Sequence, residues 1–126
     1  MSRGSLVAVV DDDESVRETT KDLLESAGYS AVTFASAELL LKSTLVDRLS
    51  CLIADMRMPG ISGLELRREL LALDHAIPTI LVSAYLDERL RARALQAGVV
   101  CCLSKPFSPE ELLECVHRAV RRDGGR

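Results

Sequence analysis

Aromatic residues, long hydrophobic runs and an excess of positive charge are all scarce in this chain of 126 residues. Aromatics make up 3% and Trp is absent, so a hydrophobic core has to be built from aliphatic side chains. No apolar stretch reaches the roughly 20 residues that a membrane-spanning helix needs. With 16 basic against 19 acidic residues, the sequence also lacks the basic footprint of a nucleic-acid-binding surface. We therefore expect neither a membrane segment nor direct binding to nucleic acid.

The cysteines follow no metal-binding or disulfide spacing, because no C-x-x-C pair occurs. Cys101 and Cys102 are adjacent, so on a strand they would point to opposite faces. Free Cys is among the residue types most often buried, and disulfides are rare in reducing compartments. We expect small buried hydrophobes at Cys51, Cys101, Cys102 and Cys115.

Two further features describe the setting of the chain. Residues 1–5 lead straight into an apolar run and show no signal-peptide pattern, so we expect a cytoplasmic protein. His75 and His117 lie far from each other and from every cysteine in the sequence, which gives no support for a zinc site or a Cys-His nucleophile. We expect both histidines on the surfaces of helices.

Short β-rich runs alternate with longer helical patterns along the whole chain. This alternation is typical of an α/β domain in which helices cover both faces of a parallel sheet. The length suits one domain with one core. The predicted strands are Leu6–Val10, Ala31–Phe34, Leu49–Ala54, Thr79–Val82 and Val99–Leu103.

The predicted helices are marked by capping residues. Asp13 is suited to begin the first helix and Gly28 to end it. Ser108, Pro109 and Glu111 form the capping-box pattern at the start of the last helix. Four of the five predicted helices run from Asp13 to Gly28, from Ala37 to Thr44 after the cap Ser36, from Asp87 to Gly98, and from Ser108 to Val120. The remaining helix, third in the chain, follows Gly63 and is expected to bury Leu64, Leu66, Leu70, Leu71 and Leu73.

Polar side chains follow four of the predicted strands. Asp11 and Asp12 come after the first strand, Asp55 after the third, Ser83 after the fourth and Lys105 after the fifth. In open parallel sheets, functional groups gather beyond the carboxyl ends of the strands. Two carboxylates about 4 Å apart repel by roughly 4 kcal/mol at an effective dielectric near 20, so a divalent cation or raised pKa values must relieve the repulsion. All-oxygen ligands favour Mg²⁺, with Mn²⁺ as a substitute.

This set of groups is suited to one kind of chemistry. A carboxylate beside Mg²⁺, with a hydroxyl and an ammonium nearby, can attack a phosphoryl group while the cations neutralise the charge on its oxygens. The product would be an aspartyl phosphate.

Four segments together resemble the response-regulator receiver domain (CheY-like) of bacterial two-component signalling, and in particular the receivers of two-domain transcription regulators. They are Val9–Arg17, Ala54–Gly63, Val82–Ala84 and Ser104–Phe107, and the resemblance extends from about Leu6 to Val120. It implies a flavodoxin-like, doubly wound five-stranded parallel sheet of order 2-1-3-4-5 with five helices. Residues 1–126 would then form a single receiver domain, with 121–126 as a frayed tail or the start of a linker.

The resemblance also implies roles for individual residues. Asp55 would be the phosphoacceptor, receiving the phosphoryl group from the phosphohistidine of a sensor histidine kinase. Lys105 would pair with the carboxylate or with a phosphoryl oxygen, and Ser83 would bond to the phosphoryl group once it is present. Such a domain is not an enzyme in the usual sense, because it catalyses only its own phosphorylation and dephosphorylation.

For the metal, the resemblance implies four ligands. Asp11 and Asp12 would hold Mg²⁺ directly or through water, with help from Asp55 and from the backbone carbonyl of Arg57. It also implies a cis peptide bond between Lys105 and the following proline.

Two positions differ from the family pattern. Receivers usually carry Phe or Tyr three residues before the lysine, and this chain has Cys102 there. Because Cys has no ring, we expect phosphorylation to persist and activation to proceed without the usual rotation of an aromatic side chain. Tyr85 flanks the site together with Arg57, either as a shield of the phosphate from water or as an exposed ring without a role.

The sequence leaves alternatives open for the output of the domain and for its function class. The resemblance implies self-association or partner docking through helix four, strand five and helix five, a surface that carries Arg89, Arg91, Arg93 and Arg118 on expected exposed positions. A pseudo-receiver, which keeps the fold without phosphate control, is favoured only by Cys102. A Mg²⁺-dependent phosphatase with Asp11 as its nucleophile leaves Asp55 and Lys105 without specific roles.

Overall fold

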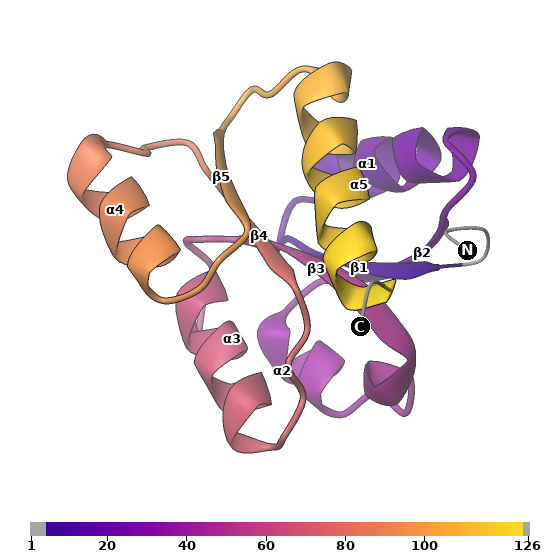
Figure 1. Cartoon of the computed structure of the whole chain (residues 1–126), viewed down its shortest axis with the longest axis horizontal. Helices are drawn as coiled ribbons and strands as arrows, with labels where there is room; N and C mark the ends of the chain where they lie inside the picture. The colour runs from indigo at the N-terminus through magenta and orange to yellow at the C-terminus, as the bar shows by residue number, and fades with distance from the viewer. Residues whose placement is uncertain (1–4, 125–126) are drawn as a thin grey trace.

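Five parallel strands form the centre of the molecule, and a helix follows each of them in the chain (Figure 1). The structure is a computed structural model that describes residues 5–124, with side chains described as far as residue 121. The elements are β1 (Leu6–Val10), α1 (Glu14–Ser26), β2 (Ser30–Phe34), α2 (Ala37–Leu41), the 3₁₀ helix η1 (Val46–Arg48), β3 (Leu49–Asp55), α3 (Gly63–Ala72), β4 (Thr79–Ser83), α4 (Glu88–Gln96), β5 (Cys101–Ser104) and α5 (Pro109–Gly124).

The strand order is β2-β1-β3-β4-β5, and every neighbouring pair is parallel. The chain therefore reverses direction across the sheet after β2, when it returns past β1 to form β3. This is the doubly wound, flavodoxin-like order, and the predicted fold class is confirmed. The reversal places the carboxyl ends of β1 and β3 side by side, in register from Val10 opposite Ala54.

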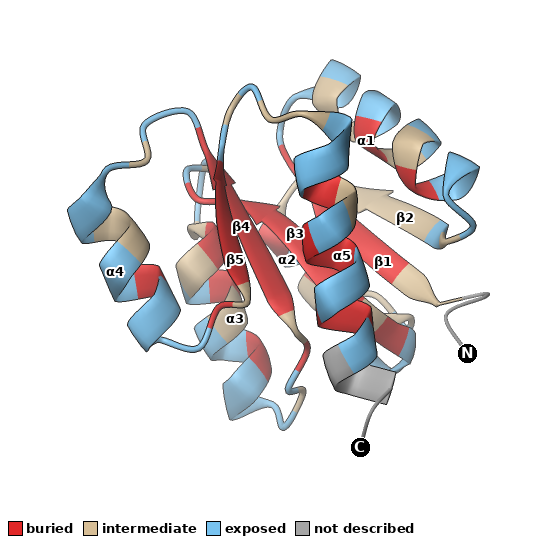
Figure 2. Cartoon of the chain, turned by 45° about the horizontal axis from the view of Figure 1, so that its top comes forward, coloured by how far each residue is buried: buried red, intermediate tan, exposed pale blue. Residues whose placement is uncertain are grey.

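Successive strand residues divide the core into two layers. Ala8 and Val10 face the side that carries α2, α3 and α4, whereas Val7 and Val9 face the side that carries α1 and α5 (Figure 1). All four are at most 2% exposed, so β1 is buried on both faces. Figure 2 shows the same arrangement, with the largely buried strands β1, β3 and β4 between helices whose outer surfaces are exposed. A strand covered on both faces explains why β1, β3 and β4 read as continuous apolar runs.

The helix caps set the boundaries of the helices. Asp13 accepts hydrogen bonds from the backbone N–H groups of Ser15 and Val16, and so begins α1 as predicted. Ser108 and Glu111 form the predicted capping box of α5. A second capping box, formed by Ser62 and the third residue of α3, was not anticipated.

Three local predictions were wrong. The second helix ends at Leu41, and the turn η1 takes up part of the segment before β3. Leu71 and Leu73 are 43% and 57% exposed, because α3 buries the stripe of Leu66 and Leu70 and ends at residue 72. His75 lies in the loop after α3, where its Nδ1 is 3.5 Å from an Asp47 carboxylate oxygen. The expected helical surface position holds for His117 alone, on α5.

The remaining general expectations concern the cysteines, the ends of the chain and the membrane. All four cysteines are free and buried, as predicted. The helix α5 continues through Gly124, beyond the expected end of the core at Val120, and residues 1–4 and 125–126 lie outside the described part of the chain. Between residues 5 and 124, no helix is long and apolar enough to cross a membrane.

Candidate functional site

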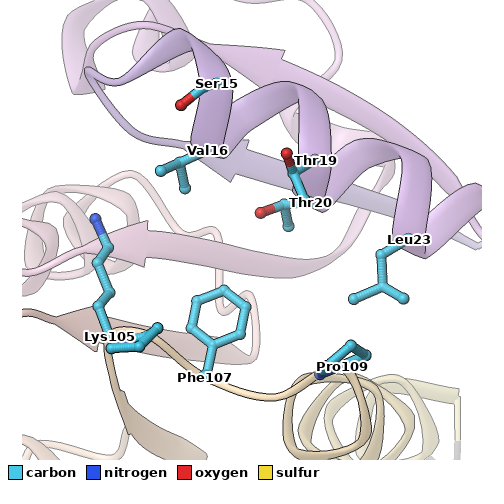
Figure 3. Close-up of a pocket in the computed structure, with 9 residues that line it drawn as sticks. Ser15, Val16, Thr19, Thr20, Leu23, Lys105, Phe107 and Pro109 are labelled. Atoms are coloured by element: carbon cyan, nitrogen blue, oxygen red, sulfur yellow. The ribbon is translucent and has the colours of Figure 1, made fainter.

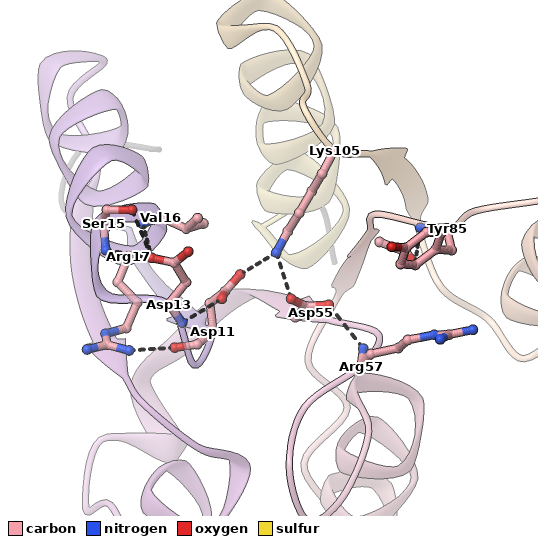
Figure 4. Close-up of polar contacts among 10 residues, drawn as sticks. Asp11, Asp13, Ser15, Val16, Arg17, Asp55, Arg57, Tyr85 and Lys105 are labelled. Atoms are coloured by element: carbon pink, nitrogen blue, oxygen red, sulfur yellow. Dashed lines mark hydrogen bonds and ion pairs between the residues drawn. The ribbon is translucent and has the colours of Figure 1, made fainter.

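The polar residues predicted from the sequence lie together beyond the carboxyl ends of the strands (Figure 4). Asp11 follows the last residue of β1, and Asp55 is the last residue of β3. Ser83 ends β4, and Lys105 follows the last residue of β5. Residues that are up to 94 positions apart in the sequence thus meet at one edge of the sheet.

Three carboxylates form the acidic part of this edge. One oxygen from each of Asp11, Asp12 and Asp55 lies within 4.8 Å of the other two. Asp11 is 2% exposed and Asp55 is 7% exposed, whereas Asp12 is open to solvent. Buried carboxylates at this spacing repel strongly unless a cation lies among them.

Lys105 supplies a positive charge directly to this cluster. Its Nζ donates hydrogen bonds to Asp55 Oδ2 at 2.6 Å and to Asp11 Oδ2 at 2.9 Å. Burial of the ammonium lowers the pKa of Lys105, but its hydrogen bonds to Asp55 and Asp11 and their charges outweigh burial, and the net pKa is raised. The backbone N–H of Lys105 donates to the Ser83 carbonyl at 2.9 Å, which fixes the lysine at the end of β5.

Backbone N–H groups orient the two buried carboxylates. Asp11 Oδ1 accepts from the N–H of Asp13 at 2.9 Å, and Asp55 Oδ1 accepts from the N–H of Arg57 at 3.0 Å. Arg17, one turn into α1, donates from its Nη1 to the Asp11 carbonyl at 2.7 Å. This contact of Arg17 was not predicted from the sequence, although the residue lies within the segment Val9–Arg17. Each buried carboxylate therefore has one oxygen turned to a backbone donor and one to Lys105.

The donor chemistry of this edge fits a hard divalent cation. Carboxylate oxygens are the preferred protein ligands of Mg²⁺, which binds through one or two of them and retains several waters. Asp12 is exposed and within reach of Asp11 and Asp55, so a hydrated ion has access from solvent. The metal role of the Arg57 carbonyl, which no contact in the structure addresses, stays a prediction.

Gly63 is required by the packing beneath Asp55. A Cβ atom at this position would lie 2.6 Å from the Asp55 carbonyl oxygen and 2.9 Å from Leu81 Cδ2. Contacts this short force the surrounding atoms apart, so only glycine lets the start of α3 approach the end of β3. The approach fixes the backbone that carries Asp55.

Tyr85 lies on the opposite side of Asp55 from Asp11 (Figure 4), and Ser83 is hydrogen-bonded to it. Ser83 is 1% exposed, and its Oγ accepts from the N–H of Tyr85 at 3.1 Å. The hydroxyl oxygen accepts in this bond, so the hydroxyl proton remains available to donate to another acceptor. The Tyr85 ring is 71% exposed and carries the Arg57 guanidinium at 5.4 Å from its centroid. The ring is thus paired with Arg57 at the rim of the site.

Cys102 lies in the core and not at the acidic edge. It is 4% exposed and packs in the layer under α2, α3 and α4. Its carbonyl accepts from Arg91 Nη1 at 3.0 Å, which connects α4 to β5. The expected exposed position of Arg91 was wrong, because its long side chain reaches back over the apolar surface to the strand.

A groove next to the site was not anticipated from the sequence (Figure 3). It has a volume of about 430 Å³ and lies between α1 and the segment that joins β5 to α5. Val16 and Leu23 line it from α1, and Phe107 and Pro109 line it from the other side. Lys105 borders both the groove and the acidic cluster, so the groove opens beside this cluster. The signal in the sequence was the pair of apolar α1 positions seven residues apart.

The strand order and the acidic edge point to one family of signalling domains. A family model for the response regulator receiver domain matches residues 7–117, and the chain belongs to this family. Receiver domains of this family occur in two-component systems and in transcriptional regulators. The Lys105-Pro106 peptide bond is cis, as the resemblance implied.

The chain is similar over nearly its whole length to curated proteins, one of which is named as a response regulator. Nodulation protein W of Bradyrhizobium diazoefficiens is 42% identical over 125 residues, which cover 99% of this chain and 55% of that protein. The response regulator protein TodT of Pseudomonas putida is 38% identical over 119 residues, or 94% of this chain and 52% of that protein. The chain thus spans about half the length of these curated relatives.

Solved structures agree with the family at the level of the fold. The response regulator StyR aligns with a TM-score of 0.89 and 39% identity, covering 98% of this chain and 62% of that chain. The structure named FixJ-N aligns with a TM-score of 0.83 and 32% identity, covering 94% of this chain and 95% of that chain.

Proposed function

We propose that this chain is a phosphorylation-activated switch in which Asp55 receives a phosphoryl group from the phosphohistidine of a sensor histidine kinase. The observation that supports this most directly is the contact of Lys105 Nζ with Asp55 Oδ2 at 2.6 Å, beside two further carboxylates. A carboxylate held by an ammonium at the end of a buried strand is oriented for attack on an incoming phosphorus atom. The family membership supports the same donor class.

The proposed step uses groups that the fold already holds in place. An Asp55 oxygen forms the new O–P bond while the P–N bond of the donor breaks and its imidazole leaves. Lys105 then moves its hydrogen bond from Asp55 to a phosphoryl oxygen, and Ser83 donates its free hydroxyl proton to another. Asp11, Asp12, Asp55 and the Arg57 carbonyl would hold Mg²⁺, or Mn²⁺ in its place, and the bound ion would neutralise charge on the phosphoryl oxygens. The chain modifies itself and turns over no separate product.

Incubation with acetyl phosphate and Mg²⁺, followed by intact mass measurement, tests the proposal. We expect a single phosphoryl adduct that hydroxylamine removes, because hydroxylamine cleaves acyl phosphates and spares phosphoserine. Chelation of Mg²⁺ with EDTA should prevent adduct formation. An unmodified mass both with acetyl phosphate and with a histidine kinase would contradict the proposal.

The proposed output is a change in self-association through α4, β5 and α5. Arg89 and Arg93 on α4 and Arg118 on α5 are exposed on this surface. A phosphoryl group that favours one of two states must raise the dimer affinity by the coupling factor, typically about 5- to 150-fold. Sedimentation with and without beryllofluoride measures this factor, and an unchanged monomer fraction would rule out a phosphate-controlled dimer.

Two other functions use the same fold. Cys102 supports a pseudo-receiver, in which Asp55 is phosphorylated without any change in the affinity for partners. The phosphatase alternative is less well supported, since it gives no specific role to Asp55 or to the 2.6 Å contact of Asp55 with Lys105. For the domain itself we infer a cytoplasmic location and no direct contact with nucleic acid, on the basis of family membership and of the formal net charge of -3.

A further inference from the structure

The three carboxylates of the acidic edge are held in place to different degrees. Asp11 and Asp55 are buried, and each has one carboxylate oxygen on Lys105 and the other on a backbone N–H. Asp12 is exposed, and no group among the described residues makes a hydrogen bond or an ion pair with its side chain. One of its oxygens nevertheless lies within 4.8 Å of the other two carboxylates. The position of the Asp12 carboxylate is therefore set by the backbone that carries it.

The peptide unit that joins Asp11 to Asp12 determines this backbone. A peptide unit is planar, so its carbonyl oxygen and the Cα atom of the next residue move together. The Asp11 carbonyl lies beyond the paired residues of β1, which end at Val10, and Arg17 Nη1 donates to it at 2.7 Å (Figure 4). A hydrogen bond from a guanidinium is stronger than one between neutral groups. The contact thus holds the peptide plane from which the Asp12 side chain extends.

The helix itself gives no reason for a cation at position 17. Arg17 is the fourth residue of α1, and the partial positive charge at a helix N-terminus favours carboxylates over cations in the first turn. Its guanidinium forms no ion pair with a carboxylate of the described residues. Long side chains on a helix point back toward the helix N-terminus, so an arginine here reaches over the loop that contains Asp12. Arg17 therefore serves the loop and not the helix.

We propose that Arg17 is a positioning residue for the metal site, which holds Asp12 in place to bind Mg²⁺ together with Asp11 and Asp55. In this role Arg17 contacts neither the ion nor the phosphoryl group, and it acts through the Asp11 carbonyl. The inference rests on the proposed function, because it assigns Arg17 a role at the metal site of that function. Loss of a group that orients metal ligands typically weakens metal binding by about 10- to 100-fold.

The charge of Arg17 and its contact with the loop predict opposite effects when the guanidinium is removed. If Arg17 were only a nearby positive charge, its removal would relieve repulsion of the incoming ion, and Mg²⁺ would bind more tightly. If Arg17 positions Asp12, its removal frees the loop, and Mg²⁺ binds more weakly. The sign of the change in the Kd for Mg²⁺ therefore distinguishes the two roles.

The test is an NMR titration of the unphosphorylated, metal-free chain with Mg²⁺, which measures the Kd without any phosphoryl transfer. We expect Arg17→Met to raise the Kd by about 10-fold or more. Arg17→Lys should restore part of the affinity, because an ammonium on a long side chain can still donate to the Asp11 carbonyl. Lys21→Met is the matched control, since it removes one positive charge one turn further along α1 and should leave the Kd close to that of the wild type.

The outcomes separate this inference from the proposed function. A Kd for Arg17→Met that is equal to or below that of the wild type would overturn the positioning role and leave the proposed function intact. A wild type that binds no Mg²⁺ would contradict the metal site itself and this inference with it. The same spectra show whether each variant is folded. If Arg17→Met is not, Arg17→Gln, which is uncharged and shorter than arginine, should show the same rise in Kd.

The dependence of phosphorylation on Mg²⁺ gives a second readout. Because Arg17 contacts no reacting atom in this role, the rate of phosphorylation of Arg17→Met by acetyl phosphate should be low at limiting Mg²⁺ and return to the wild-type rate at saturating Mg²⁺. A rate that stays well below the wild type at saturation would overturn the assignment, since Arg17 would then act on phosphoryl transfer itself. A wild type that forms no adduct but binds Mg²⁺ would contradict the proposed function, while the Kd values would still decide the role of Arg17.

Discussion

Replacement of Asp55 by Asn is expected to abolish the phosphoryl adduct completely. An amide oxygen is a poor nucleophile toward phosphorus. The neutral Asn side chain also attracts Lys105 and a metal ion less strongly than a carboxylate does. The fold should persist, because the Asn side-chain oxygen can still accept from the N–H of Arg57, and Lys105 keeps its 2.9 Å bond to Asp11. Intact mass after incubation with acetyl phosphate and Mg²⁺ measures the adduct, and circular dichroism checks the fold.

Asp13→Asn is the matched control for this variant. Asp13 is an exposed carboxylate next to the site, but its Oδ1 accepts from the N–H groups of Ser15 and Val16 at the start of α1. Asn is as good a cap as Asp, so the control removes one nearby acid without disturbing the helix. It should be phosphorylated like the wild type. An adduct of equal yield in Asp55→Asn would mean that another residue accepts the phosphoryl group.

The architecture was predictable from the sequence because the apolar runs and the helix caps both indicate the same alternation of strands and helices. The apolar runs of β1 and β3 are too short for helices and are continuous, as strands buried on both faces must be. Local caps such as Asp13 and Ser108 depend only on neighbouring residues, so their sequence pattern is sufficient. The strand order, in contrast, came from the resemblance to a family, since the alternation of strands and helices permits several orders.

The wrong local predictions share a physical cause. Leu71 and Leu73 are apolar, but whether they are buried depends on how far α3 extends and on which of its faces meets the sheet. His75 was placed on a helix because the sequence does not show that the chain turns at Asp74, whose φ is 70°. Such positions are decided by packing between distant segments, which a pattern within one segment does not contain.

The residue types of the candidate site were predictable from the sequence, but the contacts that hold these residues in place were not. Asp11 and Asp55 could be placed because they lie at the carboxyl ends of apolar runs, where functional groups gather in a doubly wound sheet. The contacts of Arg17 and Arg91 with backbone carbonyls required the structure, since a long side chain can reach any of several acceptors. The need for glycine at position 63 likewise follows from a contact with the Asp55 carbonyl oxygen, which is made across two elements.

Replacement of Lys105 by Met should change two properties of the protein, the rate of phosphorylation and the stability of the fold. Methionine fills a similar volume but supplies no charge to the phosphoryl oxygens in the transition state. The rate of phosphorylation by acetyl phosphate should fall by about 100-fold or more, as it does when a donor to a developing anion is removed. A time course of adduct mass at fixed acetyl phosphate and Mg²⁺ measures the rate, and Lys42→Met, which changes an exposed lysine, should match the wild type.

The same substitution should destabilise the metal-free protein at neutral pH. It leaves Asp11 and Asp55 close together without their shared cation, as when one partner of a buried ion pair is deleted. The Lys105 side chain retains 22% exposure, so we expect about 2 kcal/mol, below the roughly 3–5 kcal/mol found for fully buried pairs. Urea unfolding in EDTA measures the difference. Mg²⁺ should reduce it, because the ion replaces the missing positive charge among the carboxylates.

The pH dependence gives the sharpest form of this prediction. The pKa of Lys105 is raised in the folded protein above its ordinary value of 10.5, so its contribution to stability is fully present below that value. As the pH rises through the raised pKa, the wild type loses the proton on Lys105 and with it the advantage over Lys105→Met. The stability difference should therefore be constant from pH 7 to about pH 10 and shrink at higher pH. A difference that is unaffected by strong alkali would mean that the lysine stabilises the fold through the packing of its carbon chain and not through its charge.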